Sequence, residues 1–109
     1  MTTKLIRDLI PEIAAANGQQ LRIHTAGTNE MTGLLLKKLG EETHEVSDAA
    51  SDEDFLEELA DVLEVLHAIT RFNGWTLDDL EAARLRKRLE RGGFDRQLVL
   101  TTVDAEASR

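Results

Sequence analysis

Two long stretches of the sequence carry apolar residues at helical spacing, and they constrain the fold more than any other feature. Residues 30–50 and 53–72 both repeat apolar side chains at intervals of three and four, which is typical of amphipathic helices. A short polar break separates them, and Ser51 or Asp52 within it is a suitable cap for the second helix. The pattern predicts two long helices that pack along their apolar faces.

The apolar face of residues 53–72 contains carboxylates. On a helical wheel, Glu58 falls inside the apolar arc and Asp61 lies at its edge. Glu57 and Glu64 point the other way, as solvated carboxylates should. Two acidic groups of this helix therefore face the predicted helix–helix interface.

The helix predicted at residues 30–50 shows the same anomaly. Glu42 falls in the middle of its apolar side, and Glu45 falls between two apolar residues. Glu41 lies at the margin, and Lys38 also points inward. Both helices are thus expected to bring carboxylates to a shared interface from which water is excluded.

Burying ionised carboxylates together lowers the stability of the fold, by several kcal/mol for each unpaired group. One solution is a structural cluster of salt bridges with Lys38 and the arginines near the C-terminus. The other is a divalent cation; oxygen ligands without cysteine or a nearby histidine select a hard ion such as Mg²⁺, Mn²⁺ or Ca²⁺. The wheels alone leave both solutions open.

The remaining sequence predicts a mainly α-helical bundle. A short helix is expected at residues 11–16, ended by Asn17-Gly18, and a further helix after Thr76 that runs to about Arg91. Asn29 is the expected cap of the first long helix. Residues 21–24 and 97–103 alternate or are β-branched, so we expect a small two-stranded ribbon. We interpret residues 1–103 as one domain and residues 104–109 as a frayed tail.

Composition narrows the classes of function. The formal net charge of −8 argues against binding of nucleic-acid polymers or anionic membranes. The chain has no cysteine, so disulfides and thiolate metal sites are excluded. No apolar run approaches the roughly 20 residues of a membrane span, and the first residues lack a secretory signal pattern. A cytoplasmic location is the default expectation.

The spacing of the acids resembles a known family. The acids read Glu41-Glu42-x-x-Glu45 and then Glu58-x-x-Asp61, and pairs at i, i+3 on adjacent helices converge on one point. This pattern resembles the all-α nucleotide pyrophosphohydrolase superfamily, the MazG-like proteins. The resemblance extends to an opening segment, KLIRDLIPEI at residues 4–13, and a closing segment, RGGF at residues 91–94.

The resemblance implies a Mg²⁺-dependent enzyme, with Mn²⁺ an alternative ion, that hydrolyses a nucleoside triphosphate to a monophosphate and pyrophosphate. It implies a helical fold completed in a homodimer or homotetramer. Glu41 would bind a further ion or position the attacking water. Two alternatives remain: a phosphoribosyl-ATP pyrophosphohydrolase, which the stretch from Lys38 to Ala50 also resembles, and a non-catalytic helical module that binds a nucleotide or a partner. The implied metal ligands are Glu42, Glu45, Glu58 and Asp61.

Basic residues are needed near the metal because the substrate is a polyanion. Lys38 is one helical turn before Glu42, so pairing with a carboxylate and contact with a phosphate are equally compatible with its position. Arg84, Lys87, Arg88 and Arg91 form one stripe, in which we expect Arg84 and Arg88 to pair with acids. The residues expected to bind substrate are Lys38, Lys87, Arg91, Arg7 and Phe94.

Overall fold

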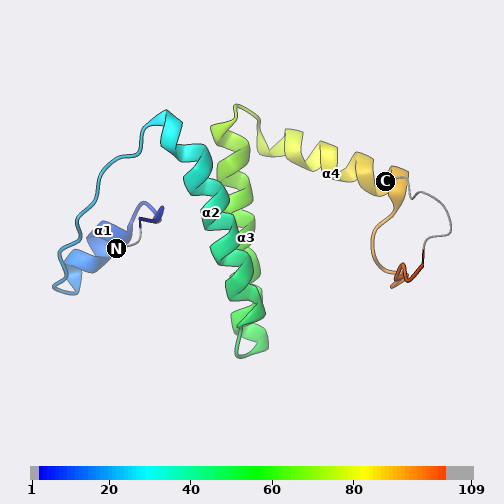
Figure 1. Cartoon of the computed structure of the whole chain (residues 1–109), viewed down its shortest axis with the longest axis horizontal. Coiled ribbons are helices and arrows are strands. Elements are labelled where there is room, and N and C mark those ends of the chain that lie inside the picture. The colour runs from blue at the N-terminus through cyan, green and yellow to red at the C-terminus, as the bar shows by residue number, and fades with distance from the viewer. Residues whose placement is uncertain (1–2, 103–109) are drawn as a thin grey trace. The chain divides into compact units, whose positions relative to one another are not determined.

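The protein is an all-α chain, as expected from the sequence. The computed structural model describes residues 3–102. They form α1 (Ile10–Ala16), α2 (Thr28–Ser47), α3 (Asp52–Phe72) and α4 (Leu77–Arg91), shown in Figure 1. By its contacts the chain divides into two compact units, residues 1–76 and residues 77–109. The first unit contains α1, α2 and α3, and the second contains α4.

The helix ends follow local chemistry. Ser51 caps α3, because its hydroxyl oxygen accepts a hydrogen bond from the backbone N–H of Asp54 at 3.2 Å. The expected cap at Asn29 is wrong: α2 starts earlier, and the Glu30 carboxylate accepts a hydrogen bond from the backbone N–H of Gly27. The Glu30 side chain can reach back to this N–H, so the helix needs no cap from Asn29.

The C-terminal stops are the expected ones. Asn17 and Asn73 are the C-cap residues of α1 and α3. Gly18, Gly74 and Gly92 follow α1, α3 and α4 with φ of 78°, 87° and 83°, a conformation that glycine adopts without a steric penalty. The predicted stop at Asn17-Gly18 is therefore confirmed, and α3 and α4 are followed by glycines of the same conformation.

The expected two-stranded ribbon is wrong. Residues 21–24 and 97–102 are irregular, and the structure contains no strand between residues 3 and 102. Val103 and the predicted tail at residues 104–109 lie outside the described part of the chain. The alternating segments are too short and too exposed to stabilise a pair on their own, since an isolated hairpin is marginal in water.

Helices α2 and α3 form the centre of the first unit. They run side by side in opposite directions, joined by residues 48–51 (Figure 1), and they are packed together along their length. The buried residues are few: Ala14 on α1, Leu35 on α2, and Val65 and Thr70 on α3. The Thr70 hydroxyl donates to the carbonyl oxygen of Leu66, which satisfies it within the helix. The exposed apolar residues of α3 are Phe55, Leu56, Leu59, Leu63, Leu66 and Phe72.

Within residues 3–102, every helix is too short or too polar to cross a membrane.

Candidate functional site

The pairing of α2 and α3 brings three carboxylates together. Glu42 comes from the C-terminal third of α2, and Glu58 and Asp61 come from adjacent turns of α3. One carboxylate oxygen from each lies within 4.8 Å of the others. All three residues are half-buried. Of the four acids expected to converge from the i, i+3 spacing, these three therefore do so, and Glu45 does not.

Glu58 has the most perturbed environment in the cluster. Burial raises the pKa of the Glu58 carboxyl above its ordinary value, because the charged form loses solvation. Within residues 3–102, Glu58 forms no ion pair with a basic side chain. The charges of neighbouring carboxylates raise its pKa further, those of Asp61, Glu42, Glu45 and Asp54.

The expectation of a water-excluded interface around four carboxylates is wrong. Glu45 is exposed and lies outside the group of converging oxygens, although its charge still acts on Glu58. The side chain of Asp61 is 38% exposed and that of Glu42 is 15% exposed. A helix wheel gives the direction of a side chain but not how far the neighbouring helix covers it, and a two-helix layer covers only part of each face.

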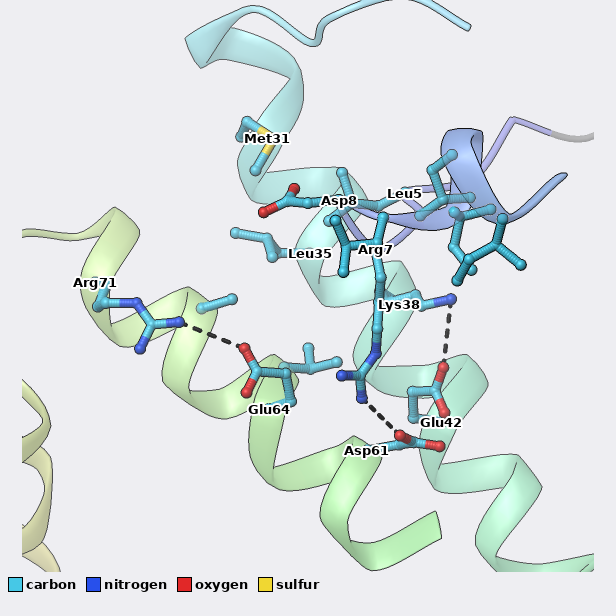
Figure 2. Close-up of a pocket in the computed structure, with 16 residues that line it drawn as sticks. Leu5, Arg7, Asp8, Met31, Leu35, Lys38, Glu42, Asp61, Glu64 and Arg71 are labelled. Carbon is cyan, nitrogen blue, oxygen red and sulfur yellow. Dashed lines mark hydrogen bonds and ion pairs between the residues drawn. The ribbon is translucent and has the colours of Figure 1, made fainter. Parts of the chain in front are cut away.

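Two cations already contact the cluster. The Lys38 Nζ lies 3.3 Å from Glu42 Oε1 and 3.8 Å from Glu41 Oε2, with the lysine side chain 19% exposed. Arg7 Nη2 donates a hydrogen bond of 2.6 Å to Asp61 Oδ1. Figure 2 shows both side chains reaching the acids from the same side. Of the two roles open to Lys38 in the sequence, pairing with a carboxylate is the one seen.

The oxygen cluster is compatible with a hard dication. Ligand oxygens around Mg²⁺ lie at about 2.0–2.1 Å, so opposite ligands are about 4 Å apart. Oxygens of Glu42, Glu58 and Asp61 within 4.8 Å of one another need only small rotations to meet this geometry. The donors are all carboxylate oxygens, which suit Mg²⁺ or Mn²⁺ rather than softer metals.

A cleft opens beside the cluster. It has a volume of about 560 Å³, and Glu42 and Asp61 lie at its edge. Arg7 and Lys38 also line it (Figure 2). Its other walls come from the segment before and within α1 and from the facing surfaces of α2 and α3. The carboxylates therefore border a cavity of a size that accepts small organic ligands.

Two polar residues of this cleft were not predicted. Glu64 was expected to point into solvent, yet it lines the cleft and its Oε2 lies 3.4 Å from Arg71 Nη2. A wheel of α3 alone gives no sign of this, because the third wall of the cleft comes from residues 5–13, far away in the sequence.

The basic residues of α4 belong to the second unit. Arg84 pairs with Glu81 and Arg88 pairs with Asp95, which confirms the expectation that these two arginines contact acids. Lys87 and Arg91 are exposed, and Phe94 is 95% exposed. Their predicted roles in substrate binding stay predictions.

Comparison with known proteins adds no family assignment. No protein-family model, curated protein or solved structure matches the chain.

Proposed function

We propose that the chain is a Mg²⁺-dependent nucleoside triphosphate pyrophosphohydrolase that releases a nucleoside monophosphate and pyrophosphate. The observation that supports this most is the convergence of oxygens from Glu42, Glu58 and Asp61 at the margin of a cleft. Their spacing resembles that of the MazG-like proteins. Removal of non-standard or excess nucleotides in the cytoplasm is the physiological role that we propose.

Glu42, Glu58 and Asp61 would hold the ion, and the resemblance adds Glu45, whose charge acts on Glu58, as a fourth ligand. The dication supplies charge neutralisation of the triphosphate and activation of water. In the reaction, the water oxygen bonds to the phosphorus nearest the nucleoside, and the bond from that phosphorus to the bridging oxygen breaks. Pyrophosphate leaves with the electron pair of this bond. We assign to Glu41, which is half-buried beside Lys38, the role of binding a further ion or positioning the attacking water.

Arg7 and Lys38 would bind the phosphates. Each now neutralises a carboxylate, Asp61 and Glu42 respectively. A dication bound between the acids would take over that role and leave both cations to face the anionic substrate. A guanidinium is suited to two phosphate oxygens at once, and an ammonium acts as a point charge.

The same ion pairs favour a second candidate, a helical module without catalysis. Lys38 and Arg7 together neutralise two of the three converging acids, so the cluster does not require a metal for charge balance. Glu58 distinguishes the two: it remains ionisable, without a basic partner within residues 3–102, among other acids. A purely structural cluster gains nothing from this third carboxylate.

We also propose that the protein works as a homo-oligomer, a dimer or a tetramer. Leu56, Leu59, Leu63 and Leu66 of α3 are 69%, 44%, 50% and 37% exposed. Their spacing of three, four and three is that of the contact face of a coiled coil. A second copy that packs on this face would remove the apolar stripe from water and complete the helical layer.

The decisive experiment is pyrophosphate release by Glu58→Gln. We expect the parent to release pyrophosphate from one or more nucleoside triphosphates, or from phosphoribosyl-ATP, in the presence of Mg²⁺ and not in EDTA. The variant should lose this activity and keep its helical circular dichroism. Glu57→Gln, one residue away and exposed, is the matched control and should keep the activity.

The outcomes separate the candidates. Pyrophosphate from phosphoribosyl-ATP alone would replace our proposal by the histidine-pathway enzyme. Pyrophosphate from none of the substrates would support the non-catalytic module. Equal rates in Glu58→Gln and the parent would show that the ligand assignment is wrong.

A further inference from the structure

The wall of the cleft formed by α2 changes character along the helix. Met31, Leu35, Lys38 and Glu42 all line the cleft and follow one another at intervals of four, three and four. By helix rise they span about 16 Å. The wall is thus apolar at Met31 and Leu35, cationic at Lys38 and anionic at Glu42.

The wall formed by α3 shows the matching gradient in the opposite chain direction. Asp61 lies at the carboxylate end, and Val65 and Ala68 follow at intervals of four and three. Val65 is buried and Ala68 is half-buried. Because α2 and α3 run antiparallel (Figure 1), the apolar positions of the two walls lie toward one end of the cleft and the acidic positions toward the other. One end is therefore lined by Lys38 and the carboxylates, and the other by apolar residues of both helices together with Asp8, which Figure 2 shows beside Leu35.

The third wall carries exposed apolar side chains. Leu9 and Ile13 line the cleft, yet they are 68% and 53% exposed. Large aliphatic side chains around a cavity of about 560 Å³ have therefore not collapsed onto α2 and α3. Apolar surface of this kind, beside a few polar groups, is what small-molecule sites present to their ligands.

A polar pair borders the apolar end. Arg71 Nη2 and Glu64 Oε2 lie 3.4 Å apart, and about half of each side chain is exposed. Figure 2 shows Glu64 between Arg71 and the Arg7–Asp61 pair. The guanidinium donates hydrogen bonds and the carboxylate accepts them. The pair can therefore hydrogen-bond to the edge of a ligand that carries both acceptors and donors.

We infer that this cleft binds the nucleoside part of the substrate, with the base against Met31, Leu35 and Ala68 and its polar edge toward the Glu64–Arg71 pair. The inference rests on the proposed function and deepens it, since it places the organic moiety within the first unit. The triphosphate would then extend past Arg7 and Lys38 to the carboxylates. A ligand with flat apolar faces, a polar edge and a polyanionic tail matches the gradient of both helical walls.

The test compares ligands with and without the nucleoside. Isothermal titration calorimetry with Mg²⁺ present would measure binding of inorganic triphosphate and of the four deoxynucleoside triphosphates in uncleavable α,β-methylene form. We expect the parent to bind at least one nucleotide about tenfold more tightly than inorganic triphosphate. Ala68→Leu fills the apolar end and should remove this advantage, while the affinities for inorganic triphosphate and Mg²⁺ stay within about twofold of the parent.

Two further variants make the test specific. Ala82→Leu on exposed α4 is the matched control and should bind every ligand as the parent does. Arg71→Met removes the donor from the polar edge without filling the cleft, so it should change the ranking of the four nucleotides but not the affinity for inorganic triphosphate. This variant tests the inference even if Ala68→Leu fails to fold.

The failures are distinguishable. Equal affinities of the parent for nucleotides and inorganic triphosphate, or an unchanged nucleotide affinity in Ala68→Leu, would overturn the inference while pyrophosphate release left the proposed function standing. Absence of both nucleotide binding and pyrophosphate release would overturn both.

Discussion

The Arg7 guanidinium lies 2.6 Å from Oδ1 of Asp61, although the two residues are 54 positions apart in the sequence. This contact joins the N-terminal segment to the carboxylate cluster on α3. The guanidinium would therefore compete with the proposed dication for the same carboxylate. The side chains of Arg7 and Asp61 are 57% and 38% exposed, so solvent weakens the competition but does not remove it.

Removal of this competitor should tighten metal binding. We expect Arg7→Gln to lower the Kd for Mg²⁺ about fivefold without nucleotide, which corresponds to roughly 1 kcal/mol of removed repulsion between nearby charges. Titration calorimetry measures this directly. Arg22→Gln, which makes the same change of charge at an exposed residue before α2, should leave the Kd unchanged. Equal Kd values for Arg7→Gln and the parent would mean that Arg7 does not oppose the ion.

Glu58 should be destabilising when the ion is absent. Its pKa is raised by burial and by neighbouring acids, so the ionised form at neutral pH is unfavourable in the folded protein. We therefore expect Glu58→Gln to have a higher Tm than the parent in EDTA. Mg²⁺ at about one hundred times its Kd should add roughly 2.7 kcal/mol to the free energy of unfolding of the parent and much less to that of the variant. A lower Tm of the variant in EDTA contradicts this assignment.

The exposed leucines of α3 should control assembly. Leu63→Glu places a charge in the middle of the stripe and should convert the oligomer to a monomer, measured by light scattering coupled to size exclusion. Leu98→Glu replaces another exposed leucine, 75% exposed and outside the helices, and should not change the mass. A monomeric parent at micromolar concentration would disprove the proposed assembly.

Glu30 should make the free energy of unfolding depend on pH. The backbone N–H of Gly27, and then His24, lower the pKa of the Glu30 carboxyl in the folded protein. A depressed folded pKa stabilises the protein above the ordinary pKa of 4.5, and this contribution is lost as pH falls through the folded value. Urea unfolding should therefore show Glu30→Gln less stable than the parent at pH 7, with the difference disappearing toward pH 3. A difference that is constant with pH would show that the charge has no part in the cap.

Features that depend on a single helix, or on two helices packed together, could be predicted from the sequence. The convergence of Glu42, Glu58 and Asp61 was predictable because each acid interrupts an apolar face, and two faces of this kind pack together. The Ser51 cap was predictable from hydrogen bonding within a single turn. The exposure of Glu45 was not predictable, because a helical wheel does not show how far the neighbouring helix shields each position from solvent.

The long-range contacts of irregular segments could not be predicted from the sequence. The Arg7–Asp61 contact and the cleft depend on how residues 5–13 fold back on α2 and α3, which no periodicity encodes. The same limit explains why a wheel of α3 did not predict that Glu64 lines the cleft. The prediction of a two-stranded ribbon was wrong for a different reason. Residues 21–24 do alternate in polarity, but no second strand within residues 3–102 pairs with them.

A second contact also holds the N-terminal segment, and its chemistry has an evolutionary consequence. Lys37 on α2 donates a hydrogen bond of 3.0 Å from Nζ to the backbone carbonyl oxygen of Thr3. Every amino acid offers that carbonyl, so this contact does not depend on the side chain at residue 3 but does need the ammonium group at residue 37. Related chains should therefore vary at the first position and retain a long basic side chain at the second.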